Sequence, residues 1–463
     1  MIEEVVIQRV LGAALRTGGD FAEIFAEDRR SSSAMLDDGK IEELSSGRDR
    51  GAGIRVVVGD STGFAHTADL SENGLRAAAD TAAAAARSTS QGDRTVALSR
   101  ADAPAPNQIL VLPETIAKAS KVELLVRADE AARSEGGAIK QVSVRVADSR
   151  RRILVANSDG LLAGDDQVKT LFTVACVAVG DTGMQTGRET KGMSVGWEMF
   201  DQFDVEEHGR KVARQALTKL QARPAPSGAM PVVIGSGGGG VLFHEACGHG
   251  LEADLVGKGA SVFKGRRGEL VASPLVTLVD DGTMAEEWGC FAIDDEGTPA
   301  GRNVLIEDGV LTDYMWDFLR ARKEGRGRSG NGRRQSYQHL PMVRMTNTYV
   351  LAGHDDPGGI VASTDHGVFI KSLGGGQVNT ATGDFVFGMT EAYLIEGGEI
   401  TDPIREGNLI GNGPKVLSLI DAVGNDFSMG PPGMCGKDGQ GVPVGDGIPT
   451  LRVTELTIGG TAA

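Results

Sequence analysis

Apolar residues recur three and four positions apart in several stretches of the first half of the chain, which is the spacing of one helix face. The first such stretch covers residues 2–15 and is followed by Gly18 and Gly19, which would end a helix in the usual way. Further helices are expected over residues 71–88, 113–136 and 205–222.

Apolar and polar residues alternate between these helices, as in half-buried strands. The run from Asp37 to Lys40 predicts a turn between two of the strands. Strands are expected over residues 21–30, 40–46, 53–60 and 170–181, and residues 142–160 are expected to form a hairpin of their own. Residues 1–223 are thus predicted to be an α+β domain, in which helices pack against an antiparallel sheet.

The pattern changes after residues 221–230, whose proline, alanine and glycine predict a linker. Residues 224–463 show short apolar stretches between glycine turns, and one helix is expected at 239–250. Sixty-six of the 463 residues are glycine, about twice the usual share of roughly 7%, which favours tight turns and short strands. A β-rich second domain carrying that one helix is therefore predicted.

The charged residues argue against some functions and locations of the protein. The net charge of −16 disfavours direct DNA or RNA binding, because an acidic surface repels phosphate backbones. The basic segment 320–334 is either a solvated loop or a loop that steers an anionic chain end. Glu3 and Glu4 stand where a signal peptide would be basic, and no apolar run reaches 18 residues, so a cytoplasmic protein without membrane association is expected.

The stretch HEACGH, residues 244–249, offers candidate metal ligands. His244 and His249 are five residues apart, so on a regular helix their side chains would point about 140° apart. Gly248 and Gly250 would permit a widened, π-type turn that brings both rings to one face. Glu245 would then serve as a general base for a metal-activated water. The alternative is a pair of surface or capping histidines.

A third ligand must come from another segment. Cys435 is a candidate, because its loop of glycine and proline gives little packing and a thiolate binds zinc well. Glu252 and Asp254 are candidates either as ligands or as residues that orient an imidazole. The remaining cysteines lack a C-x-x-C spacing and are expected to be buried packing residues: Cys176 and Cys290 in strands, and Cys247 in the helix.

Three segments in register resemble one known family. HEACGHGLEAD (244–254), GRRQSYQHLPMVRMTNTY (332–349) and GMCGKDGQGVPVGDGIPTLRV (433–453) closely resemble the TldD branch of the TldD/PmbA metallopeptidases. The resemblance implies one Zn²⁺ per chain, held by His244, His249 and Cys435, with Glu245 as the catalytic base. It covers the whole chain.

The resemblance also implies substrates and partners. Members of the family cut short or unfolded peptides, including peptide leaders and antitoxins. They assemble as homodimers or as heterodimers with a metal-free PmbA-like paralogue. The alternative is a non-catalytic peptide-binding or gyrase-modulating regulatory subunit, which would need no metal.

Hydrogen-bond donors for the substrate are expected in the segment NGRRQSYQHLPMVRMTN, because peptide hydrolysis needs groups that stabilise the oxyanion. The candidates are Arg333, Arg334, Tyr337 and His339. The alternative is a loop whose polar residues only hold its own structure.

Overall fold

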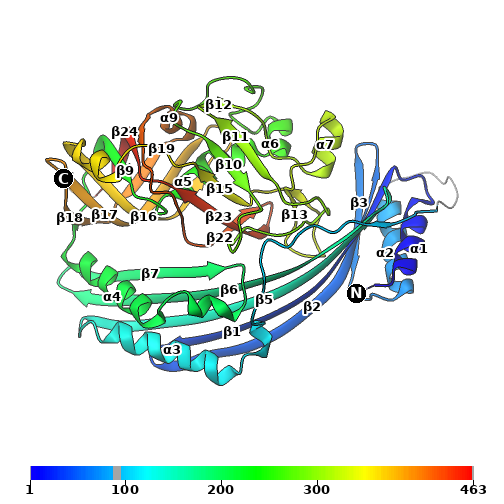
Figure 1. The fold of residues 1–463 in the computed structure, drawn as a ribbon, viewed down its shortest axis with the longest axis horizontal. Coiled ribbons are helices and arrows are strands. Elements are labelled where there is room, and N and C mark those ends of the chain that lie inside the picture. The colour runs from blue at the N-terminus through cyan, green and yellow to red at the C-terminus, as the bar shows by residue number, and fades with distance from the viewer. Residues whose placement is uncertain (1, 87–94, 461–463) are drawn as a thin grey trace.

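The computed structural model describes residues 2–86 and 95–460. The first half of the chain forms a seven-stranded sheet whose long, curved strands run beneath the second half (Figure 1). Its order is β3-β2-β1-β5-β6-β4, with β7 also paired to β6. The strands are β1 (Phe21–Asp37), β2 (Lys40–Val58), β3 (Ser61–Thr67), β4 (Ser99–Arg100), β5 (Ile139–Asn157), β6 (Leu161–Gly180) and β7 (Gly183–Met193).

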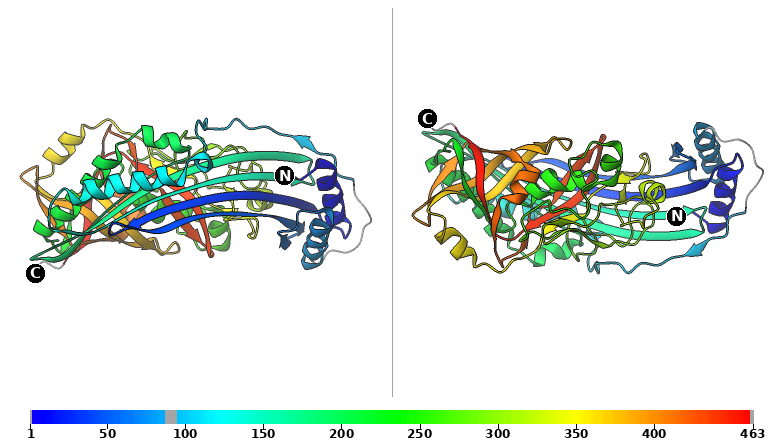
Figure 2. Two further views of the ribbon diagram at one scale, coloured as in Figure 1. Left: turned by 90° about the horizontal axis from the view of Figure 1, so that it is seen from below. Right: turned by 90° about the horizontal axis from the view of Figure 1, so that it is seen from above.

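Four helices accompany this sheet: α1 (Glu4–Leu15), α2 (Glu72–Ala85), α3 (Lys118–Arg133) and α4 (Val205–Gln221). Ile24 and Ala26 of β1 share a core with α1 and α2, whereas Ala34 and Leu36 share a second core with α3 and α4. Side chains alternate along a strand, so these even-numbered positions face the helices and the odd-numbered ones face the opposite side. Figure 2, seen from below, shows α3 (cyan) on the side turned away from the second half. Gln215 of α4 also donates to Glu391 of the second half, at 3.2 Å.

Some boundaries differ from the predictions. Residues 142–160 do not form their own hairpin, because they belong to the single strand β5, which pairs with β6 after a turn at 158–160. The predicted strands 40–46 and 53–60 are likewise one strand, β2. With up to 20 residues, the strands of this half are longer than the predicted ranges.

The helix predicted over 113–136 begins only at Lys118. Pro113–Thr115 form a 3₁₀ turn, and Ile116 is extended. The last two positions of the helix predicted over 71–88 lie outside the described residues.

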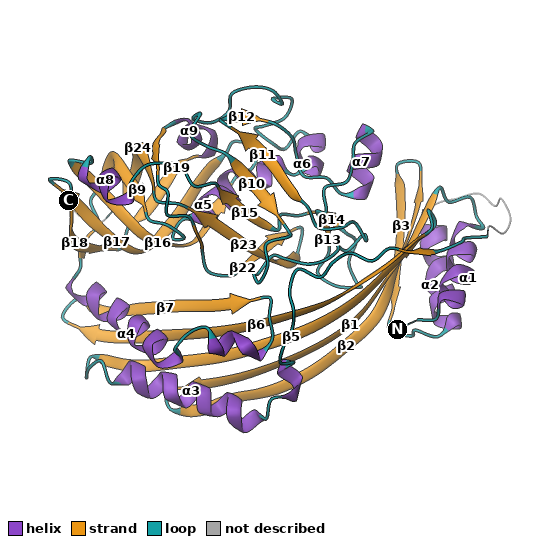
Figure 3. Ribbon diagram, in the orientation of Figure 1, coloured by secondary structure: helices purple, strands orange, loops and turns teal. Residues whose placement is uncertain are grey.

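The second half is rich in short strands (Figure 3). Its larger sheet closes on itself, because β16-β9-β24-β19-β17 are neighbours in that order and β17 pairs back to β16. Strands β18, β8 and β20 extend this barrel. The strands are β8 (Arg223–Pro224), β9 (Gly228–Ile234), β16 (His366–Val378), β17 (Asp384–Glu396), β18 (Glu399–Arg405), β19 (Asn408–Asn412), β20 (Ile420–Val423) and β24 (Leu451–Gly459).

A second sheet lies beside this barrel, in the order β12-β11-β10-β15-β23-β21 with β22 paired to β23. Its strands are β10 (Leu278–Asp281), β11 (Arg302–Glu307), β12 (Val310–Leu311), β15 (Asn347–Val350), β21 (Ser428–Met429), β22 (Gly433–Lys437) and β23 (Gln440–Ile448). Two further strands, β13 (Gly332–Arg333) and β14 (Met342–Val343), pair with each other. The helices are α5 (Gly240–Phe243), α6 (Ala253–Lys258), α7 (Phe318–Glu324), α8 (Pro357–Ala362) and α9 (Gly413–Ser418). The α+β class with a β-rich second half is confirmed.

Two predicted loops have more structure than their composition indicates. Within the expected linker 221–230, β8 pairs with β18 and β9 pairs with β24. The basic segment 320–334 begins inside α7 and ends at two buried arginines. No helix within 2–86 or 95–460 has the length and apolarity to cross a membrane.

Buried ion pairs join the first sheet to the second half of the chain. Arg55 of β2 lies 2.8 Å from both Glu23 and Glu296, and all three side chains are almost fully buried. Arg334 reaches Glu23 at 2.6 Å. The odd-numbered face of β1 therefore supplies charges that fix the second half, with its candidate metal ligands, against the sheet.

Candidate metal centre

The helical segment from Gly240 to Leu251 changes its winding at HEACGH. One α-helical turn is followed by a π-helical turn over His244–Gly248 and a 3₁₀ turn over His249–Leu251. The predicted widening is therefore confirmed. Gly248 packs closely at this point, since a Cβ atom there would lie 2.1 Å from Sδ of Met345.

Strand β22 brings Cys435 to this widened turn. Cys435 is paired with Val442 in the β22–β23 hairpin, and its Sγ lies 3.3 Å from Nε2 of His249. The ligand atoms of His244, His249 and Cys435 all lie within 4.8 Å of one another, and all three residues are buried. Residues separated by 186 positions thus converge on one point.

The chemistry of these side chains fits a metal ion. Neither ring nitrogen of His244 has a hydrogen-bond partner among the described residues, although both are buried. Such an unpaired buried group is costly unless something else satisfies it. Two imidazoles and one thiolate form a ligand set that zinc prefers, and catalytic zinc sites have three protein ligands and one open position.

The electrostatics of the cluster favour a deprotonated sulfur. Burial disfavours the thiolate of Cys435, but the charges of His244 and His249 outweigh burial and lower its pKa to about 4. Burial likewise opposes protonation of both rings, yet the thiolate raises the pKa of His244, and Glu252 and the thiolate raise that of His249. A metal cation would replace the protons of those rings.

Glu252 orients His249 from behind. Its Oε2 lies 3.0 Å from Nδ1 of His249, so Nε2 of the ring is directed to the cluster. Lys437 lies 2.9 Å from Glu252 and 2.8 Å from Asp254. Of the two roles open for Glu252 and Asp254, the geometry places both outside the three-residue cluster, with Glu252 as the orienting carboxylate.

Two residues that surround the three candidate ligands were not predicted from the sequence. Lys437 follows Cys435 by two positions on β22, which places it on the same face of the strand, and this spacing was a usable signal. Arg344 donates to the backbone carbonyl oxygen of Cys435 and, at 3.1 Å, to that of Gln440. No local sequence pattern indicates the contacts of Arg344, because its partners lie 91 and 96 positions away.

Glu245 lies beside the cluster and is open to solvent. Its Oε2 is 3.7 Å from Nε2 of His249, and its side chain is 24% exposed whereas that of His249 is 8% exposed. Asp446 lies behind it, where burial and the charge of Glu245 raise the pKa of Asp446 to about 6 despite the opposing effect of His244. Glu245 thus has the access to water that a proton-transferring carboxylate needs.

The four residues predicted to contact a substrate have different surroundings in the structure. Arg333 donates to backbone carbonyl oxygens of Met345 and Pro443, and Arg334 pairs with Glu23. Both line a cavity between the first sheet and the β22–β23 hairpin.

Tyr337 is buried with its hydroxyl 3.3 Å from Asp49, whereas His339 interacts with Ser336 at 2.9 Å. Their role toward a substrate stays a prediction. The other cysteines, Cys176, Cys247 and Cys290, are buried as expected, but Cys290 lies in a turn and not in a strand.

The sequence matches models of one protein family over most of its length. Models of the PmbA/TldA metallopeptidases match domain 1 at residues 22–86, the central domain at 112–220 and the C-terminal domain at 227–460. The chain belongs to this family. It is therefore a metallopeptidase, and its relatives include the metalloprotease TldD homolog of Haemophilus influenzae, 40% identical over 96% of this chain and 93% of that protein.

More distant proteins are also similar to this chain. The zinc metalloprotease TldD homolog of Saccharolobus solfataricus is 26% identical over 96% of this chain and 97% of that protein. A crystal structure from Thermotoga maritima, described as a candidate modulator of a DNA gyrase, superposes with a TM-score of 0.81 at 21% identity, covering 98% of this chain and all of that one. TldE from Thermococcus kodakarensis gives 0.76 at 20% identity, covering 98% and 99%. These two structures show the shared fold.

Proposed function

We propose that this metallopeptidase uses one zinc ion, held by His244, His249 and Cys435, to hydrolyse short or unfolded peptides. The observation that carries the proposal is the convergence of three buried ligand atoms beside a solvent-accessible carboxylate. The zinc-dependent relative from Saccharolobus solfataricus supports the choice of metal.

Zinc, when bound, would supply a Lewis acid that lowers the pKa of water and polarises the scissile carbonyl. Glu245 accepts the proton of the attacking water and later donates it to the leaving amine. Glu252 holds the ring of His249 in one tautomer and orientation through its hydrogen bond to Nδ1.

The biological substrates we infer are unstructured chains, such as leader segments removed during peptide maturation or antitoxins that are degraded. The partner we infer is a second copy of the chain or a metal-free PmbA-like paralogue. A non-catalytic subunit that modulates gyrase would have no use for three converging ligands, so the geometry favours the peptidase.

Two substitutions test the proposal. Glu245→Ala should retain zinc and lose peptidase activity by about 10²-fold or more, because general acid–base catalysis supplies about that much. Cys435→Ala should lose both zinc and activity. Zinc is measured by elemental analysis, and activity with a fluorogenic unstructured peptide.

Cys247→Ala provides the matched control, since it removes a buried cysteine of the same segment that is not part of the cluster. It should retain zinc and cleave the peptide. Cleavage by the Glu245 variant at the rate of the unmodified protein would contradict the mechanism.

A further inference from the structure

A cavity of about 340 Å³ lies between the first sheet and the hairpin that carries Cys435. Strands β1, β5 and β6 form one wall, and Met434 and Pro443 of the hairpin belong to the other. Its volume is within the roughly 300–1,000 Å³ of small-ligand sites. Met434 immediately precedes Cys435 on β22, so the two side chains lie on opposite faces of this strand, Met434 at the cavity and Cys435 at the metal cluster.

The sheet side of the cavity presents an unusual row of residues. Arg29 of β1 is directly opposite Arg151 of β5, which is directly opposite Gln167 of β6. In the neighbouring row, Ser149 is opposite Lys169. Like charges placed directly opposite each other destabilise a sheet, and the charge of Arg151 lowers the pKa of Arg29.

Five cations line the cavity, but carboxylates compensate only part of them. Arg151 pairs with Glu27 and Asp295, and Arg334 pairs with Glu23. Within residues 2–86 and 95–460, no ion pair is formed by the other three, which are Arg29, Lys169 and Arg333.

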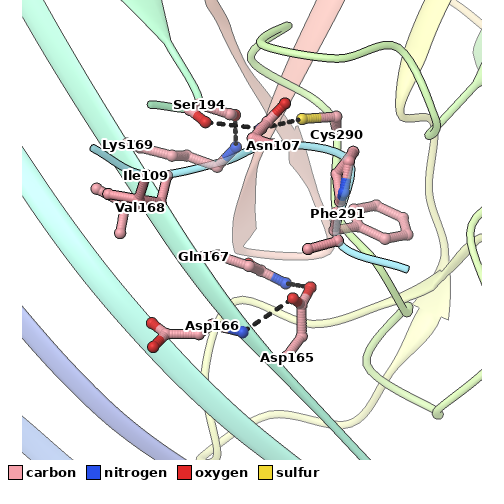
Figure 4. A pocket seen from close by; sticks show the side chains of 12 residues that line it. Asn107, Ile109, Asp165, Asp166, Gln167, Val168, Lys169, Ser194, Cys290 and Phe291 are labelled. Atoms are coloured by element: carbon pink, nitrogen blue, oxygen red, sulfur yellow. Dashed lines mark hydrogen bonds between the residues drawn. The ribbon is translucent and has the colours of Figure 1, made fainter. Parts of the chain in front are cut away.

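Lys169 and Arg333 have neutral partners only. Nζ of Lys169 donates to Oγ of Ser194 at 2.6 Å and also to the carbonyl oxygen of Trp288. Figure 4, which looks into the neighbouring pocket beside Asn107, shows Lys169 and Ser194 close together. Arg333 donates to backbone carbonyl oxygens. Both side chains are more than nine-tenths buried. Arg29 is half-buried, and its guanidinium makes no hydrogen bond to a described residue.

The same three groups have lowered pKa values. Burial is the main cause for each, and it lowers the pKa of Lys169 to about 8. The pKa of Arg29 is lowered by burial and then by the charge of Arg151. The pKa of Arg333 is lowered to about 10 by burial and by the charge of Arg344. Burial at the cavity thus disfavours these three cations, and a bound anion would offset this.

We propose that this cavity binds an oxyanion group, either a carboxylate of a peptide or a phosphate. Arg29 is the anchoring residue, because its guanidinium lines the cavity and forms no ion pair within residues 2–86 and 95–460, although the charges of Glu27, Asp49 and Asp295 act on it from farther away. Lys169 and Arg333 complete the site. The peptide form of the proposal rests on the proposed peptidase function, whereas binding of an anion does not.

Calorimetric titration of the full-length Glu245→Ala protein at constant ionic strength tests the site without cleavage of the probe. The probes are inorganic phosphate, an unstructured peptide with a free C-terminal carboxylate, and the same peptide as its amide. At least one anionic probe should bind about tenfold or more weakly after Arg29→Gln, because a charge-assisted hydrogen bond is lost.

Arg30→Gln is the matched control. Arg30 is the next residue of β1, is exposed on the other face and makes only a 3.8 Å ion pair with Glu114, so binding should not change. A carboxylate peptide that binds more tightly than its amide identifies the peptide as the source, and phosphate binding identifies phosphate.

The proposal is overturned if no anionic probe binds, or if Arg29→Gln binds every probe as tightly as the parent does. Either result would leave the peptidase proposal intact, because that proposal is judged by zinc content and by cleavage in the Glu245 and Cys435 variants.

Discussion

Replacing Glu252 with glutamine should weaken zinc binding about 10- to 100-fold without unfolding the protein. Glu252 is fully buried, and its carboxylate lies 3.0 Å from Nδ1 of His249. A hydrogen bond to a charged group contributes about 1.5–3 kcal/mol, and since about 1.4 kcal/mol is tenfold, its loss corresponds to the same range of affinity. Lys437 keeps a counter-ion in the variant, because it also pairs with Asp254.

The assay is competition for zinc against a chromophoric chelator at constant pH, with thermal unfolding recorded in parallel. Asp254→Asn is the matched control, since Asp254 shares Lys437 with Glu252, and no contact with His249 is found for it in the described part of the chain. The control should bind zinc nearly as tightly as the unmodified protein. Equal zinc affinity of the Glu252→Gln protein and the unmodified protein would refute the orienting role of this carboxylate.

Two further predictions concern the contact between the first sheet and the second half. Arg55→Met should lower the free energy of unfolding by about 3–5 kcal/mol, because Glu23 and Glu296 would lose a buried partner. Urea unfolding measures this change, and a loss below about 1 kcal/mol would contradict the prediction. Burial and Glu296 raise the pKa of Asp317 to about 7, so the folded protein holds a proton there that the unfolded chain releases near pH 4. The unmodified protein should therefore lose stability relative to Asp317→Asn as the pH rises from about 4 to about 7, by at most about 4 kcal/mol. Parallel stability curves for the two proteins across that range would show that Asp317 has no such shift.

The sequence contains enough information for the centre of the site. The five-residue spacing of His244 and His249, together with Gly248, requires a widened turn if both rings are to meet, and the structure has that turn. The resemblance to the family was needed to choose Cys435 over Glu252 and Asp254. Spacing alone does not place a ligand that lies 186 residues away.

The long strands were harder to predict because their middle sections are highly charged. The run Asp148–Arg152 looks like a turn, yet in β5 it crosses the sheet without interruption. Its arginines are compensated by carboxylates from other segments, such as Glu27 and Asp295 for Arg151. These partners lie 124 and 144 positions away, so no local pattern reveals them.

The separation between the two halves of the cluster also determines when it can exist during synthesis. His244 and His249 leave the ribosome together, but Cys435 follows 186 residues after His249. At a synthesis rate of roughly 5–20 residues per second, Cys435 is added on the order of ten seconds or more after His249. A nascent chain therefore lacks part of the proposed zinc site during that interval. Under this proposal it gains the means to cut peptide bonds only after most of its own folding units have been synthesised.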